Sequence, residues 1–141
     1  MKFKNIYTVD PTTCLNGKMN RINRLTGNIF RKHLKDFDLT NSQLTILFVM
    51  LKRGKVTQKE LSHILFMEKS SVNRNLRRLF ERGYSSKKDF PLIEITAKGK
   101  ELLETVIPSW QAAMNEIREV LQQDGEAAVD TILSKLKTTH S

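Results

Sequence analysis

The sequence predicts a mainly α-helical fold with one small β-hairpin, and three observations lead to this prediction. Apolar residues recur at steps of three and four along most of the chain, the spacing that gives a helix one buried face. Two Thr-x-x-Gln or Thr-x-x-Glu motifs stand before such segments, as capping boxes do at helix starts. Only residues 84–96 alternate instead, with Ile93 and Ile95 on either side of Glu94, which predicts two short strands joined by a turn.

The first long helix is expected over residues 11–36. Asp10 and Pro11 supply a cap and a first-turn proline. The apolar face is longer than one small core requires, so we expect part of it to be buried against a partner subunit. It consists of Leu15, Met19, Ile22, Leu25, Ile29, Phe30 and Leu34.

Three shorter helices are expected next. The first begins with the capping box of Thr40 and Gln43 and ends at Gly54, and the second begins with the capping box of Thr57 and Glu60. The third helix covers residues 68–83 and has two chemically different faces, one apolar and one rich in Ser, Asn and Arg. Its apolar stripe consists of Val72, Leu76, Leu79 and Phe80, and Gly83 can take the positive φ of a helix end.

The polar face of residues 68–83 carries side chains that contact phosphates and base edges in nucleic-acid complexes. A solvated basic face would look similar, so this segment alone leaves both interpretations open. The hairpin after it has a polar tip at Ser85–Asp89. A long helix is expected from about Thr96, and Asp124 should cap a last one.

The order of these elements describes a winged helix-turn-helix at residues 39–99. The helices on both sides, residues 11–36 and 100–138, carry more apolar surface than one chain can bury. We therefore expect them to interleave in a two-fold dimer, with residues 1–141 forming a single domain.

The charge balance favours an anionic partner. Lys and Arg outnumber Asp and Glu by 24 to 15, which gives a net charge of +9. Seven of these cations and only one acid lie within residues 69–88. The single cysteine suits a reducing compartment, and the longest unbroken apolar run, residues 46–51, is too short to cross a membrane. No targeting segment is visible, so we expect a soluble cytoplasmic protein.

Five short motifs in this order resemble the MarR family of transcriptional regulators. They are Leu39-Thr40-x-x-Gln43-x-x-Ile46-Leu47, Val56-Thr57-Gln58-x-Glu60-Leu61, Ser70-Ser71-Val72-x-Arg74-x-Leu76-x-Arg78-Leu79, Glu81-Arg82-Gly83-Tyr84 and Ile95-Thr96-x-Lys98-Gly99. The resemblance covers residues 39–99 and implies a homodimer that binds pseudo-palindromic operators in double-stranded DNA. Most members are repressors that a small ligand or oxidation releases. The alternative is a winged-helix module for protein interaction or RNA binding without operator recognition.

The resemblance and the side-chain chemistry together give a set of candidate DNA contacts. Arg74 matches the family's base-proximal Arg, and an Arg can bond both O6 and N7 of guanine. The wing lacks the Arg that usually enters the minor groove, so Lys87 and Lys88 are expected to contact phosphates instead. Ser70 or Ser71 could instead cap the helix. The other candidates are Gln58, Lys69, Asn73, Arg77 and Arg78, of which Arg78 should pair with an acid or a phosphate.

Two further features concern regulation. Cys14 near the start of the first helix could be a redox-sensitive thiol. We prefer the interpretation that it is a small apolar residue buried at the dimer interface. Arg21, Arg24, Phe30 and Trp110 could line a pocket for a small aromatic acid, although the two aromatic residues fit a dimer core better.

The sequence contains no pattern that indicates catalysis or a cofactor. His33, His63 and His140 are scattered, and no Cys, His or Asp spacing resembles a metal site. There is no Gly-rich phosphate loop and no arrangement of nucleophile and base. We therefore expect a protein without enzymatic activity, metal or cofactor.

Overall fold

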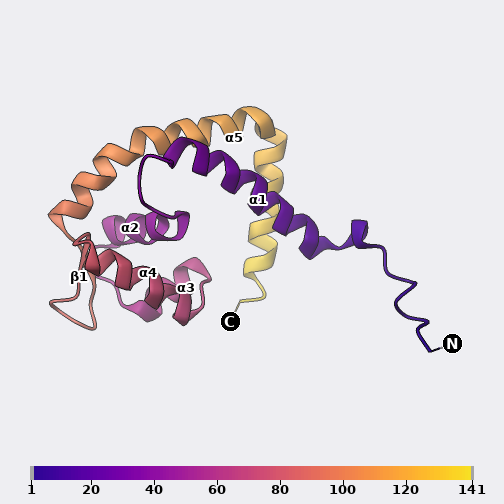
Figure 1. The fold of residues 1–141 in the computed structure, drawn as a ribbon, viewed down its shortest axis with the longest axis horizontal. Helices are drawn as coiled ribbons and strands as arrows, with labels where there is room; N and C mark the ends of the chain where they lie inside the picture. The colour runs from indigo at the N-terminus through magenta and orange to yellow at the C-terminus, as the bar shows by residue number, and fades with distance from the viewer. Residues whose placement is uncertain (1, 141) are drawn as a thin grey trace. The chain divides into compact units, whose positions relative to one another are not determined.

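The structure is a computed structural model that describes residues 2–140; residues 1 and 141, the ends of the predicted domain, lie outside the described residues. The described chain is mainly helical with one small antiparallel hairpin, which confirms the predicted fold class (Figure 1). The elements in order are η1 (Pro11–Thr13), α1 (Leu15–Leu34), α2 (Asn41–Arg53), α3 (Gln58–Leu65), α4 (Lys69–Glu81), β1 (Ser85–Ser86), β2 (Glu94–Ile95) and α5 (Ala97–Lys137).

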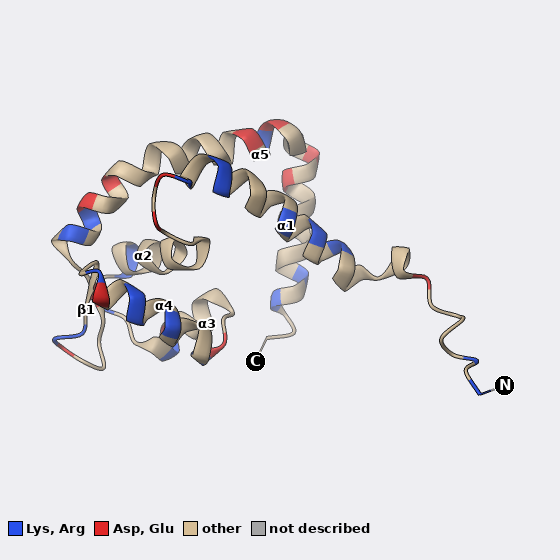
Figure 2. Cartoon of the chain, viewed as in Figure 1, with Lys and Arg blue, Asp and Glu red and all other residues tan. Residues whose placement is uncertain are grey.

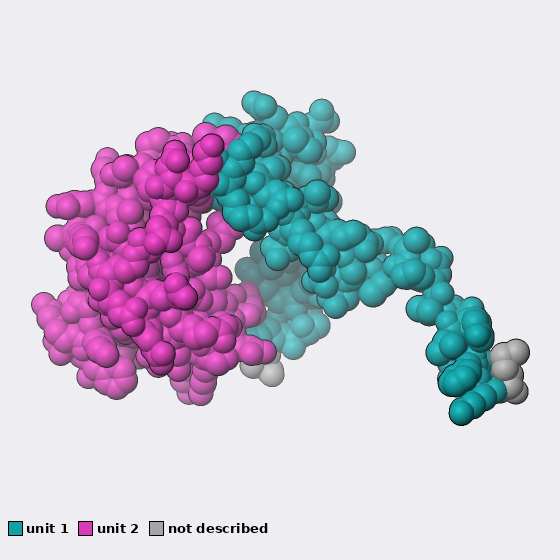
Figure 3. Space-filling view, in the orientation of Figure 1, with its two compact units in different colours: residues 1–32, 113–141 teal, residues 33–112 magenta. Residues whose placement is uncertain are grey.

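The chain divides into two compact units (Figure 3). One comprises residues 1–32 and 113–141, and the other comprises residues 33–112. We call them the terminal unit and the central unit. The predicted winged helix-turn-helix at residues 39–99 lies within the central unit.

Both predicted capping motifs start helices in the central unit. Thr40 Oγ1 accepts a hydrogen bond from the Gln43 backbone N–H (3.2 Å), and Gln43 Oε1 accepts one from the Thr40 N–H (3.2 Å), so the first capping box is complete. Thr57 Oγ1 accepts from the Glu60 N–H (3.1 Å). The Glu60 carboxylate accepts from the Thr57 hydroxyl (3.1 Å), so it orients the cap.

The core of the central unit is built from the apolar stripes of its helices. Val72, Leu76 and Leu79 of α4 are completely buried, as predicted, whereas Phe80 is only partly buried. The other side chains with almost no exposed surface are Ile46, Leu47, Met50, Val56, Leu61, Ile93, Leu103 and Val106. Burying each of these stabilises the fold by about 1.5–3 kcal/mol relative to leaving it in water.

The wing is a hairpin with very short strands. Ser85 pairs with Ile95 and Ser86 with Glu94. The polar tip was predicted to begin at Ser85, but Ser85 and Ser86 form β1. Ser85 is only 5% exposed, and its hydroxyl lies 3.8 Å from the Met50 sulfur. Val56 and Ile93 exchange two backbone hydrogen bonds (3.0 and 2.7 Å), which attach the segment between α2 and α3 to the wing.

Two glycines shape the junctions on either side of the wing. Gly83 has a φ of 77°, the left-handed conformation that the sequence predicts after α4. Helix α5 begins at Ala97, close to the expected start, and Thr96 caps it, since its Oγ1 accepts from the Gly99 N–H (3.1 Å). A Cβ at Gly99 would collide with the carbonyl oxygen of Tyr84 and lie 2.6 Å from Ile95 Cγ1.

The terminal unit departs from the prediction at both of its helices. Asp10 caps only η1, through its hydrogen bond from the Thr12 N–H (3.0 Å), and α1 begins at Leu15. The break in α5 lies at Gln122 (φ 60°, ψ −174°), two residues before the predicted cap. Beyond it, Gly125 passes so close to Leu121 that a Cβ there would come within 2.9 Å of the Leu121 Cβ.

The terminal unit leaves much apolar surface exposed in the single chain. Leu15, Ile22 and Leu25 of α1 keep 70%, 51% and 64% of their surface exposed. Val129, Ile132, Leu133 and Leu136, at the end of α5, are also exposed. Within residues 2–140, no helix combines the length and the apolar character that crossing a membrane requires.

Candidate nucleic-acid interface

Helix α4 presents an uncapped N-terminus and a polar face to solvent. Its cap position is Glu68, whose side chain makes no capping hydrogen bond, so neither Ser70 nor Ser71 caps the helix. The first backbone N–H groups of α4 thus lack a side-chain acceptor at the cap, and such groups bind anions readily. The exposed predicted contacts on α4 are Lys69, Ser70, Asn73, Arg74, Arg77 and Arg78.

Arg74 is oriented by its own helix. Its Nη2 donates to Ser71 Oγ (3.2 Å), and the Ser71 carbonyl oxygen accepts from Asn75 Nδ2 (2.9 Å). Ser71 is partly buried, so it supports Arg74 more than it faces solvent. Arg78 makes no ion pair with an acid in the part of the chain that the structure describes, and its pairing with a phosphate stays a prediction.

A hollow of about 410 Å³ lies beside α4, and we call it the wing hollow. It brings together predicted contacts from three separate segments: the start of α3, the middle of α4 and the wing. Its lining residues are Gln58, Asn73, Arg77, Phe80, Glu81 and Lys87. Phe80 and Glu81 were not predicted as part of the site, although their positions seven and eight residues after Asn73 place them on the same helical face.

The cations around the wing have different partners. Lys55 Nζ binds the Asp89 carboxylate at 2.8 Å, and this hydrogen bond raises the pKa of Lys55 and lowers the pKa of Asp89. Lys88 pairs with Glu94 at 3.7 Å. Lys87 Nζ instead lies 5.3 Å from the centroid of the Phe80 ring. Figure 2 shows these charges as blue and red segments in the wing loop, with further blue segments along α4.

A second cluster holds the end of α4 in place. Arg82 donates to the carbonyl oxygen of Asp38 and pairs with its carboxylate at 3.5 Å. The side-chain cations of Arg82 and Lys98 both lie 5.3 Å from the centroid of the Tyr84 ring. Lys98 Nζ also donates to the Arg82 carbonyl oxygen (2.9 Å). These cations are therefore used to join α4, the wing and α5.

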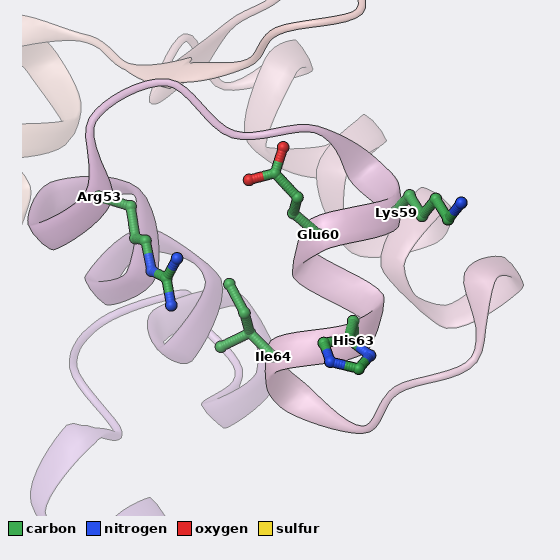
Figure 4. A pocket seen from close by; sticks show the side chains of 5 residues that line it. All are labelled: Arg53, Lys59, Glu60, His63 and Ile64. Atoms are coloured by element: carbon green, nitrogen blue, oxygen red, sulfur yellow. The ribbon is translucent and has the colours of Figure 1, made fainter. Parts of the chain in front are cut away.

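A second hollow, of about 330 Å³, lies between the end of α2 and α3 (Figure 4). In Figure 4 the Arg53 side chain is directed toward Ile64 and His63, whereas Lys59 and Glu60 point in other directions. The charged groups thus do not converge on one point, and none of these residues belongs to the predicted DNA contacts.

The residues predicted for a ligand pocket are distributed over both units. Arg21 and Arg24 are exposed on α1, and Phe30 is partly buried, all in the terminal unit. Trp110 belongs to the central unit, where its ring packs edge-on against Phe48 with 5.4 Å between the centroids. The predicted pocket for an aromatic acid stays a prediction.

Cys14 is exposed in the single chain. Its sulfur accepts a hydrogen bond from the Gly17 N–H (3.3 Å), so the thiol caps α1. Burial at a dimer interface stays a prediction, as does redox sensing. In the part of the chain that the structure describes, no cluster of His, Cys, Asp and Glu could hold a metal ion.

The comparisons with known proteins agree with this geometry. The sequence model of the MarR family matches residues 37–84, which span α2, α3 and α4 up to the first strand of the wing. The winged helix of this chain is therefore similar in sequence to that of MarR-family proteins. A comparison with proteins of curated function found no match.

Three of the solved structures that match share the fold over most of the chain. A cysteine-to-serine variant of E. coli MarR in complex with operator DNA is 21% identical, with a TM-score of 0.75, and the match covers 86% of this chain and 92% of that one. Bordetella bronchiseptica BpsR is 17% identical, with a TM-score of 0.83 and coverage of 92% and 98%. NadR in complex with 4-hydroxyphenylacetate is 20% identical, with a TM-score of 0.76 and coverage of 89% and 96%.

Proposed function

We propose that this chain is a sequence-specific DNA-binding transcriptional regulator that binds a pseudo-palindromic operator as a homodimer. The observation that carries the proposal is the construction of α4. The helix buries Val72, Leu76 and Leu79 and turns its uncapped N-terminus, with Ser70 and Arg74, to solvent. A recognition helix that enters the major groove N-terminus first has this arrangement.

The dimer is supported by the exposed apolar residues of the terminal unit. Leu15 and Leu25 of α1 are more than half exposed, and α5 ends in a further series of exposed apolar side chains. A second copy would bury these faces and add a second recognition helix by symmetry. The two helices would then read half-sites about 10 bp apart, or a multiple of that distance.

Regulation by a small aromatic acid is the form of control that we propose. The structure of BpsR was described with regulation of its DNA binding by 6-hydroxynicotinic acid, and NadR was solved with 4-hydroxyphenylacetate. By analogy, Arg21 and Arg24 would bind the carboxylate of the effector in this chain. Binding would release the operator, so the protein would act as a repressor; oxidation of Cys14 is a second route of release.

The test is selection of binding sites from random duplex DNA with the full-length protein. We expect an enriched palindrome with half-sites about one helical turn apart, bound by one dimer in sedimentation experiments. Ile22→Glu should weaken the dimer and the affinity for the palindrome together. Absence of any enriched motif, combined with binding to RNA or to an acidic protein, would refute the proposal in favour of an interaction module.

A further inference from the structure

The wing hollow distinguishes two lysines that are adjacent in the sequence. Lys87 lines the hollow, and its ammonium group lies over the Phe80 ring at 5.3 Å. Lys88 pairs with the Glu94 carboxylate at 3.7 Å. Within the described chain, no ion pair neutralises Lys87, so its charge remains available to a ligand.

An aromatic ring and a carboxylate hold a lysine in different ways. The ring attracts the ammonium group through its quadrupole and leaves the full charge in place. A neighbouring carboxylate partly offsets that charge for an anion that approaches. Because the lysine stem is long and flexible, an ammonium group already held by Phe80 loses less freedom when it binds.

The wing loop that carries Lys87 is also fixed from its other side. Asp89 binds Lys55 at 2.8 Å, and the backbone N–H of Phe90 donates to the Lys87 carbonyl oxygen (3.0 Å). The bridge between Val56 and Ile93 attaches the same region to the segment before α3. The backbone at Lys87 is thus held close to α3 and α4, where the other lining residues lie.

We propose that the wing hollow binds one phosphate of the DNA backbone, that Lys87 and Arg77 neutralise it, and that Phe80 is a positioning residue for Lys87. The side-chain amides of Gln58 and Asn73 add neutral donors from α3 and α4. Lys88, whose ammonium group lies 3.7 Å from the Glu94 carboxylate, contributes less to this phosphate than Lys87 does. This inference rests on the proposed function, because it assigns one phosphate contact within the DNA-binding surface.

Glu81 provides a second, independent test of phosphate binding in the wing hollow. It is the acid among the lining residues, and a bound phosphate would lie near this like charge. Removing the charge with Glu81→Gln should therefore strengthen binding to every DNA sequence, by about twofold to fivefold at low salt. A surface that binds no phosphate here would show no such gain.

The experiment is a fluorescence-anisotropy titration of the full-length protein with a selected operator and a scrambled duplex, between about 50 and about 200 mM salt. Lys87→Ala should weaken both duplexes about threefold to tenfold and reduce the slope of log affinity against log salt by about 0.9. Lys88→Ala, which removes the same charge from the neighbouring residue, should reduce the slope clearly less than Lys87→Ala does.

Phe80 is tested by a double-mutant cycle with Lys87. Phe80→Leu keeps an apolar side chain but removes the ring, so it should reduce affinity only while Lys87 is present. Phe80→Tyr keeps the ring and should restore the original salt slope. Thermal unfolding of each variant shows whether the central unit remains folded, which separates lost positioning from lost packing.

Two results would overturn the inference while the proposed function stands. One is specific operator binding in which Lys88→Ala changes the salt slope as much as Lys87→Ala. The other is strict additivity of the Phe80 and Lys87 losses. If the unmodified protein binds neither duplex, the proposed function itself fails and the phosphate site fails with it.

Discussion

Replacing Gly99 by alanine tests the packing between the wing and the start of α5. Inside a helix this change usually stabilises by up to about 1 kcal/mol, because glycine has more freedom to lose. At Gly99 the new Cβ would collide with the Tyr84 carbonyl oxygen and lie 2.6 Å from Ile95 Cγ1. The Tyr84 oxygen accepts the Thr96 N–H (3.0 Å), so relieving the collision also disturbs this hydrogen bond.

The magnitudes decide the sign of the effect. Overpacking in a closed site costs about 1–3 kcal/mol, and a weakened hydrogen bond costs about 0.5–1.5 kcal/mol. Together these exceed the helical gain, so Gly99→Ala should lower the free energy of unfolding by about 1–3 kcal/mol. With a urea m-value of about 2 kcal/mol/M, the midpoint would fall by about 0.5–1.5 M.

Gly17→Ala is the matched control in α1. Its new Cβ would meet Arg21 Nη1 at 3.4 Å and Cys14 Cβ at 3.5 Å, which are acceptable contacts. This variant should therefore be as stable as the original protein or slightly more stable. Both are compared by urea unfolding at one protein concentration, because the proposed dimerisation would make stability depend on concentration. A Gly99→Ala protein as stable as the Gly17→Ala protein would refute the argument from steric collision.

Three further predictions concern the recognition helix, the wing and the helix caps. Arg74→Ala should cost about 1–3 kcal/mol of operator affinity and relax base preference, which repeated site selection would detect; unchanged preference would exclude a base contact. The Lys55–Asp89 pair should stabilise the wing above the ordinary Asp value of 3.8, and this contribution is lost as the pH falls through the lowered pKa of Asp89. At the alkaline end it is present below the ordinary Lys value of 10.5 and is lost as the pH rises through the raised pKa of Lys55. Protection of the wing amides from hydrogen exchange should decrease at both pH limits, and Asp89→Asn should remove the decrease at the acidic limit. Thr57→Ala should cost about 0.5–2 kcal/mol in thermal unfolding, because it removes a helix cap, whereas Ser70→Ala should change stability little; equal losses would contradict the cap assignment.

Local signals made the central unit predictable. The capping motifs at Thr40 and Thr57 and the stripe of α4 depend on residues three or four positions apart, and such neighbours in sequence are also neighbours in a helix. The positive φ of Gly83 was likewise predictable from the residue type, because glycine adopts this conformation without a steric penalty. The order of elements followed from these signals, and with it the location of α4.

Contacts between segments that are far apart in the sequence could not be predicted. The Lys55–Asp89 pair joins residues 34 positions apart, and no pattern in either segment indicates its partner. Lys87 and Lys88 lie in the turn between β1 and β2, where no strand alternation indicates the direction of either side chain. The break in α5 was predicted at Asp124, two residues from its position at Gln122, because helical periodicity does not show which residue leaves the helical conformation.

The cluster around Tyr84 has a mechanical consequence. Arg82 and Lys98 hold the same ring from two elements, and the Thr96 hydroxyl donates to the Gly83 carbonyl oxygen (2.7 Å). These contacts join the end of α4, the base of the wing and the first turn of α5. If two such chains bind an operator as proposed, these parts would move together. An effector would then release the DNA by changing the distance between the two α4 helices, and not the shape of either one.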